Sequence, residues 1–85
     1  MGMTLNEIGL HGRTALEQRA DSKAFELGAQ RISGGINWIW AVGFSTEGAA
    51  KEFVLWLEGE SLEHRGVYPN LPRDEYPGWA VRYRS

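Results

Sequence analysis

The chain contains no cysteine, so neither a disulfide framework nor a thiolate zinc site can stabilise it. No run approaches the roughly 20 apolar residues that a membrane-spanning helix needs. The first residues lack the basic and apolar segments of a secretory signal peptide. Together these absences favour a cytoplasmic protein.

Signatures of catalysis and of cofactor binding are also missing. The sequence holds no GxSxG nucleophile elbow, no P-loop and no GxGxxG dinucleotide fingerprint. Its two histidines, His11 and His64, are far apart, and neither stands at ligand spacing from another donor. We therefore expect no enzymatic activity, no cofactor and no metal site.

Basic residues do not predominate. Nine lysines and arginines face eleven acidic residues, which gives a net charge of −2. Domains that bind nucleic acid usually carry a basic excess, so this balance argues against such a partner. Arg82 and Arg84 nevertheless lie close together in the last residues. A sheet face that binds nucleic acid through these two arginines is therefore kept as a lower-ranked alternative function.

What the chain does contain is enough apolar material for one small folded domain, residues 1–85. Hydrophobic residues make up 42% of it, and four tryptophans, three tyrosines and three phenylalanines supply large side chains. The tryptophans are concentrated, because Trp38, Trp40 and Trp56 all fall between Ser33 and Gly59.

The first helix that the sequence predicts covers residues 15–22. Thr14 and Glu17 have the spacing of a capping box, in which each side chain bonds the other residue's backbone amide. Two continuations are open. An apolar stripe could extend the helix to Gly34, or Gly34 and Gly35 could form the two-residue turn of a β-hairpin.

The hairpin is favoured because its pairing would separate large apolar side chains from small or polar ones. Residues 40, 42 and 44 would then face a helix, and the outer face would carry no aromatic ring. The predicted pairs are Phe25 with Phe44, Leu27 with Val42, Ala29 with Trp40, and Arg31 with Trp38.

The second half of the chain predicts a helix, a long loop and a last strand. Ser45 or Thr46 caps a helix whose apolar stripe ends at Gly59. Residues 60–77 contain all three prolines and predict a long connection, and residues 79–84 alternate as a strand. The expected fold class is α+β: an N-terminal helix, then ββαβ, with a three-stranded antiparallel sheet in order 2-1-3 and a helix on one face.

In that layout the strand over residues 36–44 is an edge without charge or proline. Unprotected edges pair with other strands, so a homodimer through residues 36–44 is a further hypothesis. Trp38 would lie at the hairpin tip beside Arg31, and both residue types are enriched in interface hot spots.

The favoured function is a non-enzymatic module that binds another protein, either a small adaptor or an inhibitor of the kind carried by phages and mobile elements. The alternative is a small-molecule-binding or enzymatic dimer with its site at the subunit interface. The predicted partner-binding residues come from the hairpin tip and the long loop: Arg31, Trp38, His64, Arg65, Tyr68, Asn70, Arg73 and Tyr76.

Overall fold

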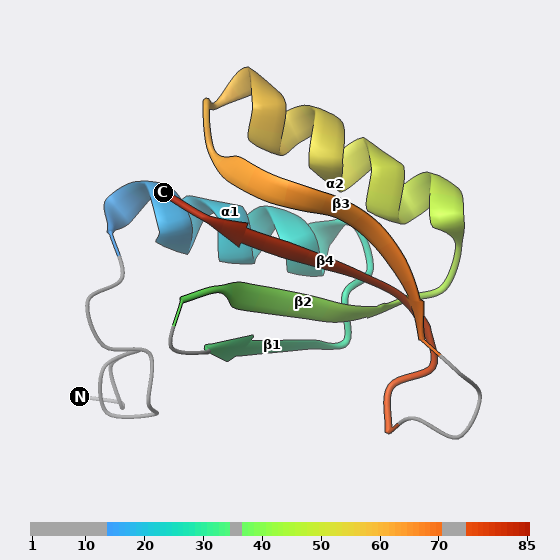
Figure 1. Cartoon of the computed structure of the whole chain (residues 1–85). Helices are drawn as coiled ribbons and strands as arrows, with labels where there is room; N and C mark the ends of the chain where they lie inside the picture. The colour runs from blue at the N-terminus through green and yellow to red at the C-terminus, as the bar shows by residue number, and fades with distance from the viewer. Residues whose placement is uncertain (1–13, 35–36, 71–74) are drawn as a thin grey trace.

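The computed structural model describes residues 14–34, 37–70 and 75–85 as two helices on one face of a four-stranded antiparallel sheet (Figure 1). The α+β class and the antiparallel sheet were predicted correctly. The prediction of three strands in order 2-1-3 is wrong, because the strand order is β1-β2-β4-β3. The elements are α1 (Ala15–Glu26), β1 (Arg31–Gly34), β2 (Ile39–Phe44), α2 (Glu47–Gly59), β3 (Glu63–Asn70) and β4 (Gly78–Arg84).

Helix α1 begins at the predicted capping box and runs further than predicted. The Glu17 amide donates to the Thr14 hydroxyl over 3.0 Å, and the Thr14 amide donates to the Glu17 carboxylate over 3.0 Å. At the other end, the Ala29 amide donates to the carbonyl of Ala24 over 2.9 Å, and the Gly28 amide donates to that of Phe25 over 3.0 Å. This pair of bonds is a Schellman motif, which ends the helix well short of Gly34.

The hairpin exists, but its register differs from the prediction. Because α1 and its cap take residues up to 29, only four residues remain for β1. Gly34 lies opposite Ile39, and Arg31 lies opposite Val42 instead of Trp38. The predicted pairs of residues 25, 27 and 29 are wrong for the same reason.

A β-bulge at Gly43 determines which face each side chain of β2 occupies. Val42 is opposite Ala80 and Phe44 is opposite Trp79, so β2 has one more residue than β4 at this point. Gly43 has a φ of 87°, and a Cβ there would lie 2.8 Å from the Cβ of Gln30. The extra residue reverses the alternation, so that Phe44 shares the helix-facing side with Ile39 and Ala41.

The prediction that Trp40 and Val42 face a helix is therefore wrong, and that for Phe44 is confirmed. Trp40 and Val42 are half-buried and lie on the side of the sheet away from the helices. Along β4 the predicted alternation holds, because Val81 and Tyr83 are fully buried whereas Arg82 and Arg84 are not.

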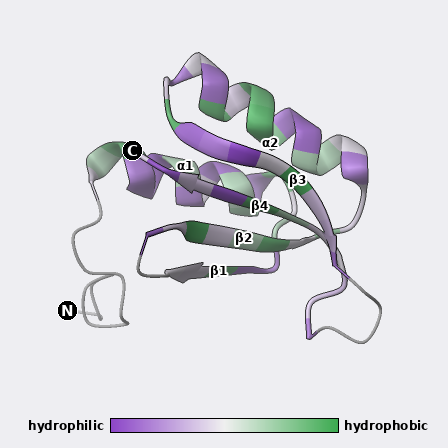
Figure 2. Ribbon diagram, in the orientation of Figure 1, coloured by the Kyte–Doolittle hydropathy of each residue, from purple (hydrophilic) through white to green (hydrophobic). Residues whose placement is uncertain are grey.

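Strand β3 occupies residues that the sequence predicted as loop. It is an edge of the sheet, where charged residues, proline and irregular pairing are common. Its pairing with β4 shifts between His64 and Val67, and Pro69 lies near its end. Figure 2 shows how hydrophilic its first half is, which explains why no strand pattern was visible.

The position of β4 also explains the strand order. Strand β4 pairs antiparallel with both β2 and β3, so β2 and β3 are parallel to each other with β4 inserted between them. Strand β2 is thus an interior strand, whose backbone groups bond to β1 and β4. The prediction that residues 36–44 form a free edge is therefore wrong. The hypothesis of a homodimer through that strand rested on the free edge and loses its basis.

The core lies between the inner face of the sheet and the two helices. Phe53 of α2 packs against Phe44 and, edge-on, against Tyr83 of β4, with ring centres 5.7 and 5.1 Å apart. The Tyr83 hydroxyl donates to Asp21 of α1 over 2.7 Å, which gives this buried phenol a partner and ties α1 to the sheet. Leu55 of α2 points outward, with 67% of its surface exposed.

We predict that Gly78→Ala lowers the free energy of unfolding by about 2 kcal/mol or more. Gly78 has a φ of 118°, and a Cβ there would lie 2.3 Å from the Phe44 carbonyl oxygen. The matched control is Gly48→Ala in the first turn of α2, where the nearest atom to a new Cβ is 3.9 Å away. That change should leave stability equal or higher by up to about 1 kcal/mol. Urea unfolding measures both, and equal stability of the two variants would contradict the described packing of β4 on β2.

Candidate functional site

The side of the sheet that faces away from α1 and α2 is lined by aromatic rings and arginines. We call it the open face, because no helix of the described residues covers it (Figure 1). Strand pairing places residues from all four strands on it, since directly opposed residues share a face. The open face consists of Arg31, Ser33, Trp38, Trp40, Val42, Glu63, Arg65, Tyr68, Ala80, Arg82 and Arg84.

Arg82 lies at the centre of the open face, directly opposite Trp40. Its guanidinium carbon is 4.8 Å from the ring centre of Trp40 and 4.8 Å from that of Tyr68. The guanidinium also donates a hydrogen bond to the Tyr68 hydroxyl. Two rings and one hydrogen bond therefore hold this cation in a fixed orientation.

Trp38 is surrounded by three arginines. The guanidinium carbons of Arg84, Arg65 and Arg82 lie 4.3, 5.2 and 5.8 Å from its ring centre. The predicted partner, Arg31, is not among them, because the register of the hairpin moves it to the other end of β1.

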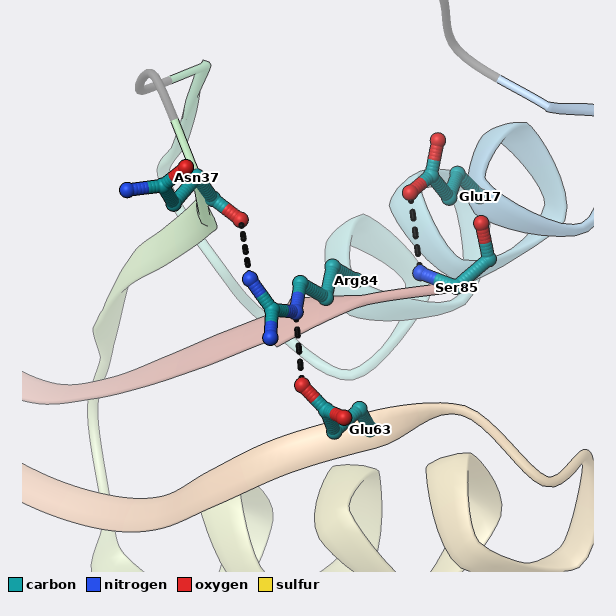
Figure 3. A network of polar contacts seen from close by, with 5 residues as sticks. All are labelled: Glu17, Asn37, Glu63, Arg84 and Ser85. Atoms are coloured by element: carbon teal, nitrogen blue, oxygen red, sulfur yellow. Dashed lines mark hydrogen bonds and ion pairs between the residues drawn. The ribbon is translucent and has the colours of Figure 1, made fainter.

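Arg84 differs from the other arginines of the open face because a carboxylate at ion-pair distance compensates its charge. Its Nε donates to the Glu63 carboxylate over 2.6 Å, and one terminal nitrogen donates to the Asn37 carbonyl over 3.4 Å (Figure 3). Arg84 thus links β3 to the segment that carries Trp38. The next residue, Ser85, donates its amide to Glu17 of α1 over 2.9 Å, which fixes the end of β4 (Figure 3).

Arg31 and Tyr76 form a separate pair near the β3–β4 connection. The guanidinium carbon lies 5.9 Å from the Tyr76 ring centre. A hydrogen bond to Tyr76 raises the pKa of Arg31 above its ordinary value. Asn70 donates to the Tyr76 carbonyl over 2.9 Å, which is a structural role in the connection.

The predicted partner-binding residues are thus only partly brought together. Trp38, Arg65 and Tyr68 meet on the open face, and Arg31 lies on the same face beside Tyr76. His64 points to the other side, opposite the buried Tyr83. Its Nδ1 accepts from the Gly66 amide over 3.0 Å and its Nε2 donates to Glu58 over 2.9 Å. Arg73 lies outside the described residues, as does His11.

Sequence reasoning missed Trp40 as a surface residue. The sequence also predicted that the outer face of the sheet carries no aromatic ring, and that prediction is wrong. A usable signal was present: Trp38 and Trp40 have the same two-residue spacing as Arg82 and Arg84. On adjacent strands, such spacing places both pairs on one face when the register is in phase.

The charges of the described elements are segregated. The two helices contain six acidic and three basic residues, whereas the four strands contain four arginines and one glutamate. The net charge of −2 thus hides a basic sheet and acidic helices. An electrostatic field of this kind steers anions toward the sheet.

Neither a metal centre nor a membrane span is found within the described ranges. No three side chains of His, Asp or Glu there lie close enough together to hold a metal ion. Helices α1 and α2 are both too short and too polar to cross a bilayer.

Comparison with models of protein families, with curated proteins and with solved structures gave no match to this chain. The open face is therefore interpreted from its own geometry and charge.

We predict that Arg82→Lys lowers the free energy of unfolding by about 1–2 kcal/mol. Lysine keeps the charge but loses the flat group that stacks on Trp40 and Tyr68. Arg19→Lys, in an exposed ion pair with Glu60, is the matched control and should change stability by less than about 0.5 kcal/mol. Chemical unfolding followed by tryptophan fluorescence compares them. If both substitutions lower the free energy of unfolding by the same amount, the guanidinium of Arg82 does not stack on Trp40 and Tyr68 as described.

Proposed function

We propose that this chain is a non-enzymatic domain that binds single-stranded nucleic acid on the open face. The observation that carries the proposal is the combination, on the open face, of three aromatic rings with two arginines that have no carboxylate partner among the described residues. The rings are those of Trp38, Trp40 and Tyr68, and the arginines are Arg65 and Arg82. No described carboxylate lies within ion-pair distance of Arg65 or Arg82. Arg31 differs, because its pKa is raised by Tyr76 and also by the nearby carboxylate of Glu75.

The chemistry of a single strand fits these groups. Unpaired bases stack on aromatic rings and on guanidinium planes, and phosphates bind the edges of arginines. A duplex hides its base faces, so it could use only the cations. The rings of the open face therefore favour a strand whose bases are free.

The charge of the open face also argues against a second copy of the chain as its occupant. A second copy docked face to face would bring the same arginines opposite one another, and like charges in contact oppose association. A polyanion has the complementary charge.

An acidic segment of another protein is the second candidate, and it continues the function favoured from the sequence. It is supported by the composition of the open face, because tryptophan, tyrosine and arginine are the residue types enriched in protein-binding hot spots. It requires no base stacking, so experiment can separate the two candidates.

We predict that the protein binds a labelled oligothymidine or oligouridine and that Trp40→Leu weakens this binding about tenfold. The loss of one stacking surface accounts for an effect of that size. Leu55→Ala is the matched control, since Leu55 is exposed on α2, away from the sheet. Fluorescence anisotropy measures affinity, and circular dichroism verifies that both variants fold.

The same assay tests the class of ligand. Raising the salt from about 50 to 200 mM should weaken oligonucleotide binding roughly tenfold, because a few phosphate contacts release counterions. A duplex of the same length should bind less tightly. No binding to either single-stranded oligomer at low salt would overturn the proposal and leave an acidic protein segment as the better candidate.

A further inference from the structure

We infer that the arginines of the open face divide their roles: Arg82 and Arg65 bind phosphate, whereas Arg84 is a positioning residue that holds Trp38. The inference rests on the proposed function, because it assigns roles within the same site. It follows from how each guanidinium is already engaged.

Arg82 is preorganised as an anion ligand. Its guanidinium is fixed between Trp40 and Tyr68, and the only hydrogen bond that its side chain makes within the described residues goes to the Tyr68 hydroxyl. Its Nε is buried and has no acceptor among them. A guanidinium has five N–H donors; with one bonded to Tyr68 and the buried Nε out of reach, three remain to bind an anion.

Arg65 adds a second uncompensated charge beside Trp38, the ring that Arg82 also approaches. It is exposed, and its guanidinium carbon lies 5.2 Å from the Trp38 ring centre, close to the 5.8 Å of Arg82. Strand pairing places Arg65 near Arg82, across the irregular part of the β3–β4 pairing. Both cations therefore lie where one short stretch of phosphates could reach them.

Arg84 differs from Arg82 because a carboxylate already compensates its charge. Glu63 pairs with it over 2.6 Å and the Asn37 carbonyl accepts a second bond. Its guanidinium carbon lies 4.3 Å from the Trp38 ring centre. It thus connects three elements of the site: β3, β4 and the segment before β2. Glu63 accordingly sets how much positive charge the open face offers.

The test is the salt dependence of oligonucleotide binding, because each phosphate contact contributes about 0.7 to the slope of log K against log salt. Arg82→Ala should reduce the slope by about 0.7. Arg84→Ala should weaken binding at every salt concentration without changing the slope. Glu63→Gln, at an exposed position, should release the charge of Arg84, steepen the slope by about 0.7 and tighten binding at low salt.

Two outcomes separate the inference from the proposed function. If wild-type protein binds but Arg84→Ala reduces the slope as Arg82→Ala does and Glu63→Gln changes nothing, the division of roles is wrong and the proposed function stands. If wild-type protein does not bind any single-stranded oligomer, both are wrong. Glu63→Gln removes no backbone contact, so it remains informative even if Arg84→Ala fails to fold.

Discussion

The bulge at Gly43 is the constraint on which the two faces of the sheet depend. With simple alternation, Phe44 would share a face with Trp40 and Val42, and the helices would have to pack on three large side chains. The extra residue places Phe44 inside with Ile39 and Ala41, and leaves Trp40 outside opposite Arg82. The buried alanines of α1 and the sheet then allow close packing of the helix on the inner face.

Local signals in the sequence predicted much of the fold. The capping box at Thr14, the apolar stripe of α2 and the alternation of β4 all depend on residues close together in the chain, and each was recognised correctly. The prediction failed where the outcome depends on distant partners. Residues 25–30 were predicted as strand, but they form the end of α1 and its Schellman motif. Strand β3 was not recognised because it carries the charges that are typical of an edge strand.

The candidate site shows the same limit. Trp38, Arg65 and Tyr68 could be selected from the sequence as residue types suited to binding, but their assembly could not. It depends on β4 lying between β2 and β3, which brings Arg82 within reach of three rings. Net charge was a poor guide for a related reason. It sums over acidic helices and basic strands that lie on opposite sides of the molecule.

The central claim is that a ligand docks on the open face, and the four tryptophans allow a direct test of it. Two indoles, Trp38 and Trp40, lie on that face, whereas Trp56 on α2 and Trp79 beside Phe44 pack against the core. The measurement is the NMR shift of the four indole N–H signals during titration with a short single-stranded oligonucleotide. If a ligand docks on the open face, the signals of Trp38 and Trp40 move and saturate together while those of Trp56 and Trp79 stay in place. Movement of the second pair alone would contradict it.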